Sequence, residues 1–144
     1  LNAQKYPVDC ACCIYATAPF VRVEYLREGY KRLVQSGKAY AFSVTSFPFP
    51  VQRAIRINKE GCVEALYPEN ISTRSQDLED TYHDAGQFYW GTSDAFLNDE
   101  VIYSSRSLPV VLPRYLVQDI DTPEDWHCAE LMFSTLQERK EASL

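Results

Sequence analysis

The run Cys10-Ala11-Cys12-Cys13-Ile14-Tyr15 is continuously apolar, which is typical of a strand covered on both faces inside a parallel sheet. Residues 23–36 follow with apolar side chains at helical spacing, and Gly37 supplies a C-terminal cap. Over residues 39–45 large and small side chains alternate, which predicts a second strand. The order strand, helix, strand indicates two parallel strands joined by a right-handed crossover.

The middle of the chain predicts a hairpin followed by a long irregular loop. Residues 53–57 and 62–66 flank a turn in which Gly61 can take a positive φ. From residue 67 to residue 82 neither the helical nor the strand period is present. A loop of that length in a compact domain is more often functional than not. We therefore expect residues 47–82 to form an inserted hairpin and arm.

The last third of the chain predicts further strands and a short helix. Strands are expected over residues 86–90, 110–112 and 116–120. A short helix capped by Ser93 is expected after the first of them.

The final helix has the clearest start in the sequence. Thr122 is the expected N-cap, Pro123 the first helical residue, and Asp125 completes a capping box. Four apolar residues at helical spacing should face a core: Trp126, Ala129, Phe133 and Leu136. Together the elements predict one α/β domain over residues 1–144, with a doubly wound core and the inserted arm.

Composition and charge narrow the class of protein. The 144 residues are 46% hydrophobic and carry a net charge of -6, which fits one globular domain and opposes a nucleic-acid surface. No apolar run approaches the roughly 20 residues of a membrane span and no leader opens the chain, so we expect a soluble cytoplasmic protein. The five cysteines are expected to be reduced thiols. Zinc bound by Cys10, Cys12 and His83 or His127 is disfavoured by their spacing.

Asp119 and Asp121 are the candidate metal ligands and catalytic residues. At the end of an extended strand, residues i and i+2 point to the same side, so both carboxylates can bind one cation. Hard oxygen ligands suit Mg²⁺, which binds through one or two carboxylates and substrate phosphates. The alternative is that Asp119 is a solvated strand end and that Asp121 belongs to the cap of the final helix.

Arg53 and Arg74 are the candidate anion-binding residues, because a guanidinium holds a carboxylate or phosphate by two parallel hydrogen bonds. Arg74 is favoured for a catalytic role by its place in the long polar loop. His83 is a candidate for substrate binding, although a structural role fits it equally well. Gln87 and Tyr89 are expected on one face of their strand, and they are candidates for substrate binding together with Tyr15, Thr17 and Gln76.

Five motifs follow one another along the chain: IYATAPF at 14–20, FPVQRA at 49–54, PENISTRSQDL at 68–78, YHDAGQFYW at 82–90, and QDIDTPEDW at 118–126. In this order they resemble the CMP-nonulosonate cytidylyltransferases, which activate sialic-acid-like sugars. The resemblance is greater to the pseudaminic acid branch, because residues 83–87 replace the Asn-Gly-Ala type of the sialic acid enzymes. It covers the C-terminal two thirds of such a protein.

The resemblance implies a Rossmann-like nucleotidyltransferase fold, a homodimer, and Mg²⁺. It implies transfer of CMP from CTP to the anomeric hydroxyl of an acidic nine-carbon sugar, with release of pyrophosphate. Asp119 and Asp121 match the family's metal-binding aspartates. Arg53 and Arg74 lie near positions that contact phosphate or the sugar carboxylate, and Tyr89 lies near the sugar pocket.

The resemblance also has consequences for the arm and for the nucleotide site. Residues 47–82 correspond to the segment that dimers exchange, so Arg74 would serve the neighbouring subunit's site. Ala16 stands where the family usually has proline. The family's phosphate loop, Ala-Arg-Gly-Gly-Ser-Lys-Arg, which grips CTP, has no counterpart in this sequence. The alternatives are an N-acetylneuraminate or legionaminate substrate, or a non-catalytic sugar-binding remnant.

Overall fold

The structure of the chain is a computed structural model that describes residues 7–141. It is a mixed α/β fold that divides into two compact units. One unit contains the chain up to Thr45 and from Asp84 onward, and the other is Ser46–His83. The second unit coincides within one residue at each end with the predicted insertion, 47–82. The two units are described separately.

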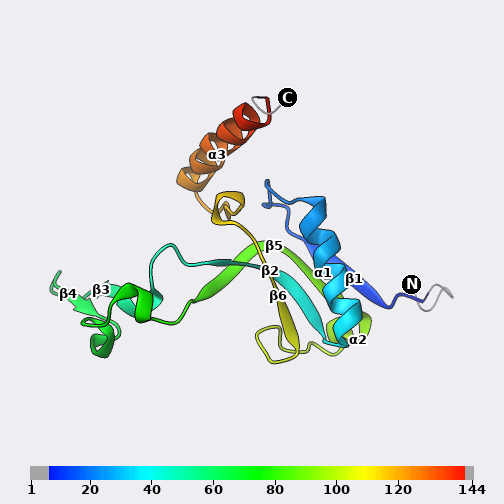
Figure 1. The fold of residues 1–144 in the computed structure, drawn as a ribbon, viewed down its shortest axis with the longest axis horizontal. Coiled ribbons are helices and arrows are strands. Elements are labelled where there is room, and N and C mark those ends of the chain that lie inside the picture. Colours follow the sequence, from blue (N-terminus) through cyan, green and yellow to red (C-terminus); the bar gives the residue numbers. More distant parts are fainter. Residues whose placement is uncertain (1–6, 142–144) are drawn as a thin grey trace. The chain divides into compact units, whose positions relative to one another are not determined.

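The first unit is built on a four-stranded sheet (Figure 1). In spatial order its strands are β1 (Cys10–Ile14), β5 (Tyr82–Thr92), β2 (Tyr40–Ser46) and β6 (Ser107–Val111). β1 is antiparallel to β5, and β2 is parallel to β6. The backbone N–H of Thr92 donates to the Ala39 carbonyl, and that of Phe47 donates to the Thr81 carbonyl, so β5 also runs antiparallel to β2.

The prediction that β1 is covered on both faces inside a parallel sheet is wrong for the described chain. β1 lies at an edge of the sheet, its neighbour is antiparallel, and Cys13 and Ile14 are exposed. A continuous apolar run signals burial, but residues 7–141 place a strand on only one side of β1. The predicted parallel relation of β1 and β2 does hold, with β5 between them.

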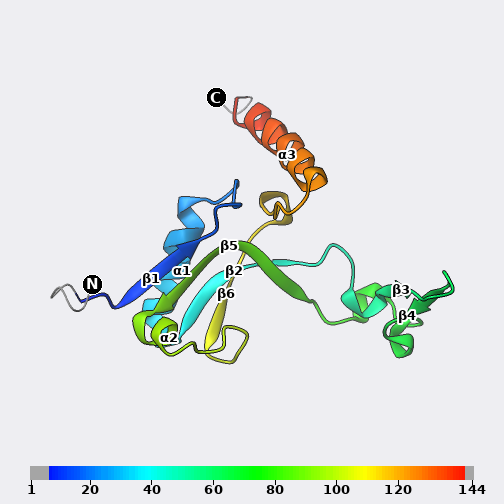
Figure 2. The same ribbon diagram turned by 180° about the vertical axis from the view of Figure 1, so that it is seen from behind.

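Helix α1 (Val23–Ser36) lies along one face of this sheet (Figures 1 and 2). It begins and ends as predicted, and Gly37 closes it with a φ of 65°. Beneath it a buried cluster of Ala85, Phe88, Val110 and Leu112 fills the interface. An added Cβ on Gly29 would lie 2.9 Å from the Trp90 ring, so glycine permits the close approach of helix and sheet.

Helix α2 (Ser93–Leu97) follows β5 directly. Its N-cap is Thr92 and not the predicted Ser93, because the Thr92 hydroxyl accepts the Ala95 N–H at 3.2 Å. The Tyr40 phenol donates to the Ala95 carbonyl at 3.0 Å, which fixes the helix to β2.

The predicted strand over residues 116–120 is absent from the described structure. A 3₁₀ turn, η5 (Arg114–Leu116), ends in a buried Leu116, and residues 117–120 have no regular structure. Leu116, one of the apolar residues that suggested a strand, instead packs against Phe20 and Ala129 in a separate small core. Asp119 and Asp121 consequently do not lie at a strand end.

Helix α3 (Pro123–Glu141) starts with the predicted capping box. The Thr122 hydroxyl accepts the Asp125 N–H at 3.2 Å, and the Asp125 carboxylate accepts the Thr122 N–H at 2.9 Å. The predicted apolar stripe is only partly buried, since Ala129 is buried but Trp126 is 58% exposed and Phe133 52% exposed. Among residues 7–141 no helix combines the length and apolar character needed to span a bilayer.

The second unit contains the predicted hairpin. Strands β3 (Ile55–Ile57) and β4 (Val63–Ala65) are antiparallel, and Gly61 in their turn has a φ of 79°. The strands are shorter than expected. Three 3₁₀ turns surround them: η2 (Val51–Arg53), η3 (Pro68–Asn70) and η4 (Ser75–Asp77), of which the last two lie in the stretch predicted to be irregular.

Candidate functional site

Several polar residues of the first unit lie around a bend in β5. Gly86 has a φ of 61°, a left-handed conformation that most residues avoid. Its N–H donates to Asp84 Oδ1 at 2.8 Å. The other oxygen of the same carboxylate accepts the phenol hydroxyls of Tyr89 and Tyr103, the latter at 3.0 Å. Asp84 therefore links the bend to two tyrosines.

Aromatic rings gather around this carboxylate. The Tyr89 ring lies 5.2 Å from that of Tyr15 and stacks on Phe42 at 5.8 Å, and Tyr103 meets Phe42 edge-on at 5.8 Å. Burial, and then the hydrogen bond to Asp84, raise the pKa of Tyr89, so its hydroxyl stays a neutral donor. Tyr15 and Tyr103 are exposed. The exposed rings of Tyr15 and Tyr103 form an aromatic surface on which the ring of a polar ligand could stack.

Gln87 is held by the protein itself. Its side chain is 2% exposed, and its amide donates to the Leu116 carbonyl. Its backbone carbonyl accepts the Tyr15 N–H at 3.0 Å. The residue predicted to contact substrate thus connects β5 to the end of η5 and to the residue after β1. Thr17, also a substrate-binding prediction, is exposed in the loop that follows.

Asp119 lies over the bend in β5. A Cβ built on Gly86 would be 3.4 Å from Asp119 Cγ and Oδ2, at van der Waals contact. Asp119 Oδ1 accepts the Ile120 N–H at 3.1 Å. Asp119 is exposed, whereas Gly86 is buried. The glycine lets the Asp119 carboxylate approach β5 to the distance at which an added Cβ would touch it.

Asp125 forms hydrogen bonds with residues that lie before and after Asp119 in the chain. One of its oxygens accepts the N–H of Asp121 at 3.2 Å and the hydroxyl of Thr122 at 2.7 Å. Its other oxygen accepts the Gln118 amide at 3.3 Å. The bonds from Thr122, its hydroxyl first, hold the pKa of Asp125 below the ordinary 3.8.

The pKa of Asp125 predicts how stability depends on pH. Because the folded pKa is lowered, the stabilisation is present above 3.8 and is lost as the pH falls through the folded pKa. In urea unfolding, wild type should have a higher free energy of unfolding than Asp125→Asn at pH 7. The difference between the two free energies should become smaller at acid pH. Glu124→Gln controls for the change in charge. A difference that becomes larger at acid pH would contradict this.

Asp119 and Asp121 fit a hard divalent cation by the chemistry of their donors. Both aspartates are exposed. The described residues contain no group of three or more His, Cys, Asp or Glu placed to hold a metal. Carboxylate oxygens are hard donors, and Mg²⁺ binds through few of them together with the phosphates of a substrate.

Four predicted site residues lie in the second unit. Arg53 donates to the Thr73 carbonyl, and Arg74 forms an ion pair with Asp77 at 3.1 Å. Gln76 is exposed on η4. The His83 ring lies 4.8 Å from that of Phe47. The Thr73 carbonyl thus binds the guanidinium of Arg53, and Asp77 binds that of Arg74. The Arg74 ion pair is solvent-exposed and correspondingly weak.

The cysteines of β1 do not gather into a thiolate site. Cys10 and Cys12 share one face of the strand, and Cys13 is on the other. Burial, and then the neighbouring Cys13, raise the pKa of Cys12 to about 11.

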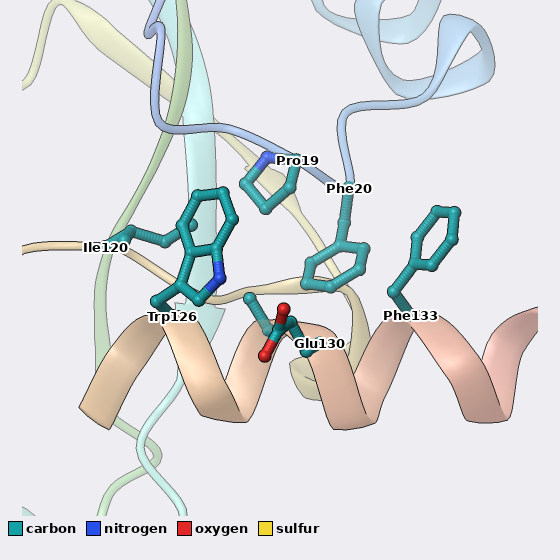
Figure 3. Close-up of a pocket in the computed structure, with 7 residues that line it drawn as sticks. Pro19, Phe20, Ile120, Trp126, Glu130 and Phe133 are labelled. Carbon is teal, nitrogen blue, oxygen red and sulfur yellow. The ribbon is translucent and has the colours of Figure 1, made fainter. Parts of the chain in front are cut away.

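An apolar pocket lies between α3 and the loop after β1 (Figure 3). Pro19 and Phe20 face the helix, from which Trp126, Glu130 and Phe133 project. Its one charged lining residue is a glutamate, so the pocket does not suit an anionic substrate.

Sequence reasoning missed Phe42 and Tyr103, and it assigned no definite role to Asp84. Tyr103 lies in a loop without periodicity, 19 residues from the carboxylate that its hydroxyl contacts. No local pattern in the sequence connects this tyrosine with Asp84.

Known proteins resemble this chain over nearly its whole length. No protein-family model matches it. It is 39% identical over 138 residues to the pseudaminic acid cytidylyltransferases of two Campylobacter jejuni strains, NCTC 11168 and 81-176, which is 96% of this chain and 60% of each relative.

A third relative is a longer protein of Helicobacter pylori 26695. It is named pseudaminic acid cytidylyltransferase and UDP-2,4-diacetamido-2,4,6-trideoxy-beta-L-altropyranose hydrolase, and it is 32% identical over 113 residues, 78% of this chain and 22% of the relative. The chain spans less than two thirds of the length of all three relatives. The chain is thus a partial match to proteins named pseudaminic acid cytidylyltransferase.

Proposed function

We propose that the natural protein containing residues 1–144 transfers CMP from CTP to pseudaminic acid. The observation that carries this proposal is the 39% identity over 96% of the chain to proteins named for that activity. The exposed carboxylate of Asp119 beside Gly86 supports it, because nucleotidyl transfer requires a place for a divalent cation near the phosphates.

The reaction is an in-line displacement. The oxygen of the sugar's anomeric hydroxyl bonds to the α-phosphorus of CTP, and the bond from that phosphorus to the bridging oxygen breaks. Pyrophosphate leaves, and the hydroxyl proton passes to solvent. Mg²⁺, when bound, would offset negative charge on the phosphates. Asp119 and Asp121 would hold it.

The remaining residues bind and orient the substrates in this proposal. The exposed ring of Tyr15 offers the sugar an apolar surface with a hydroxyl group, and the buried ring of Tyr89 supports it at a centroid distance of 5.2 Å. Arg53 and Arg74 supply positive charge for a phosphate or for the sugar carboxylate. Since both are engaged locally in the second unit, ligand would have to replace the Thr73 carbonyl and Asp77 as their partners.

The substrate assay uses the natural protein that contains this chain. With CTP and MgCl₂, pyrophosphate release is measured with pseudaminic acid, N-acetylneuraminic acid and legionaminic acid in parallel. Release with pseudaminic acid above the other two is expected. Faster release with either of the others would reassign the sugar. No release with any of the three would sink the proposal and favour a sugar-binding remnant.

The homodimer is proposed from the hairpin of the second unit. The pairing of Ile57 with Val63 and of Ile55 with Ala65 places four apolar residues on one face. Three of them are exposed, Ile57 at 75%. A two-stranded hairpin is only marginally stable alone, so this face needs a cover, which a second copy of the chain would provide.

Light scattering tests the homodimer with one changed residue. Ile57→Lys places a charge on the apolar face, and we expect it to shift the protein from dimer to monomer. Glu60→Lys introduces the same side chain in the exposed turn and should leave the dimer unchanged. A dimer that persists in Ile57→Lys would exclude this face as the contact.

A further inference from the structure

We propose that Gln87 is a positioning residue for the candidate metal site: its buried amide holds the aspartate segment, residues 117–121, against β5. The inference rests on the proposed function, in which Asp119 and Asp121 bind the divalent cation. It gives Gln87 a part in the reaction other than contact with the sugar. All the residues concerned belong to the first unit.

The aspartate segment is held at its two ends. Residues 117–120 form neither helix nor strand, so regular backbone pairing does not set their course. Downstream, Asp125 accepts the Asp121 N–H at 3.2 Å. Upstream, the segment follows Leu116, which is 3% exposed and whose carbonyl accepts the Gln87 amide. The two aspartates thus lie between the cap of α3 and a hydrogen bond from β5.

Gln87 is a rigid donor for this bond. Its backbone N–H donates to Ser43 Oγ at 3.2 Å, and its backbone carbonyl accepts the Tyr15 N–H at 3.0 Å, so both neighbouring strands fix its main chain. Its side chain is 2% exposed, and a buried amide needs a hydrogen-bond partner. The partner that its N–H₂ group finds is the Leu116 carbonyl.

The residue before Gln87 in β5 lies against the same segment. A Cβ built on Gly86 would be 3.4 Å from Asp119 Cγ, so the Asp119 carboxylate packs close to the strand. Two consecutive residues of β5 therefore contact this part of the chain, one at Leu116 and one at Asp119. Loss of the Gln87 amide would leave the buried Leu116 carbonyl unpaired. Movement of that carbonyl toward water would carry Asp119 away from β5.

The test compares Gln87→Met with Thr45→Val in the natural protein. Methionine keeps the length of the side chain and removes the amide. Thr45 is also 2% exposed, and its hydroxyl donates to the Leu112 carbonyl at 2.9 Å. Both variants therefore remove a buried donor from a main-chain carbonyl, and both should lower the thermal midpoint. Only Gln87→Met removes the bond beside the aspartate segment.

Electron paramagnetic resonance of added Mn²⁺ measures metal binding without turnover. We expect the Kd for Mn²⁺ to rise about tenfold or more in Gln87→Met, because loss of a group that orients metal ligands has an effect of that size. The Kd should stay unchanged in Thr45→Val. Asp119→Asn gives the affinity that remains when a ligand is missing. At saturating Mg²⁺, KM for pseudaminic acid should be the same in Gln87→Met as in wild type.

Gln87→Asn guards against a methionine variant that does not fold. Asparagine is smaller and keeps the amide, but it is one methylene group shorter, so it should lose the bond to Leu116 and show the same fall in Mn²⁺ affinity. Wild-type Mn²⁺ affinity in the folded Gln87 variants, with or without a higher KM for the sugar, would overturn the inference while CMP transfer by wild type upheld the proposed function.

The wild type supplies two further outcomes. Mn²⁺ binding no tighter than that of Asp119→Asn would also overturn the inference, because there would be no aspartate site for Gln87 to position. A wild type that transfers no CMP would overturn the proposed function, and the inference with it.

Discussion

Asp119→Asn in the natural protein is expected to lower kcat for CMP transfer by about 100-fold or more. Asparagine keeps the shape of the side chain but removes the charge that a hard cation requires. Loss of about 3 kcal/mol of transition-state stabilisation corresponds to that factor. Because the side chain is exposed and its Oδ1 accepts the N–H of the neighbouring Ile120, the fold should survive the change.

The control for Asp119→Asn is Glu124→Gln, which removes the same charge from an exposed position on the first turn of α3. It should retain nearly full activity. Initial rates at several Mg²⁺ concentrations separate the two effects, since loss of a ligand raises the metal requirement and a general change in charge does not. Equal kcat for wild type and Asp119→Asn would remove Asp119 from the metal site.

Gly91→Ala should have the largest effect on stability, lowering the free energy of unfolding by about 3 kcal/mol. An added Cβ would lie 2.6 Å from the Phe96 ring and 2.7 Å from the Tyr40 ring, distances that real Cβ atoms do not show. Neither ring can retreat easily. Tyr40 is 2% exposed and its hydroxyl is bound to the Ala95 carbonyl, while Phe96 packs edge-on against it at 5.4 Å.

Gly37→Ala is the control for Gly91→Ala. It lies in the same unit and adds the same methyl group with nothing within 4 Å, so only the left-handed backbone contributes, about 1 kcal/mol. Urea unfolding followed by circular dichroism measures both variants. A loss in Gly91→Ala no greater than in Gly37→Ala would show that the rings move aside at little cost.

Local signals in the sequence were sufficient for much of the fold. The left-handed Gly37 at the end of α1 and the reciprocal bonds of Thr122 and Asp125 at the start of α3 each involve residues within a few positions of one another. Their chemistry can therefore be recognised in the sequence. The hairpin around Gly61 follows for the same reason.

Features that depend on distant residues could not be predicted. Leu116 packs against Phe20 and Ala129, and this contact, absent from any local pattern, replaces the expected strand with a buried turn. The apolar run of β1 indicates that the strand is buried, but it does not indicate which neighbouring element covers it. In the candidate site, Asp119 is a prediction from its spacing to Asp121. Its place over Gly86, 33 residues earlier, required the structure.

The most direct test of the account is ³¹P nuclear magnetic resonance of the natural protein with CTP, Mg²⁺ and pseudaminic acid. The account predicts that the α-phosphorus of CTP becomes the phosphodiester of a CMP-sugar while pyrophosphate appears in equal amount. Unchanged CTP, or inorganic phosphate as the first product, would contradict it.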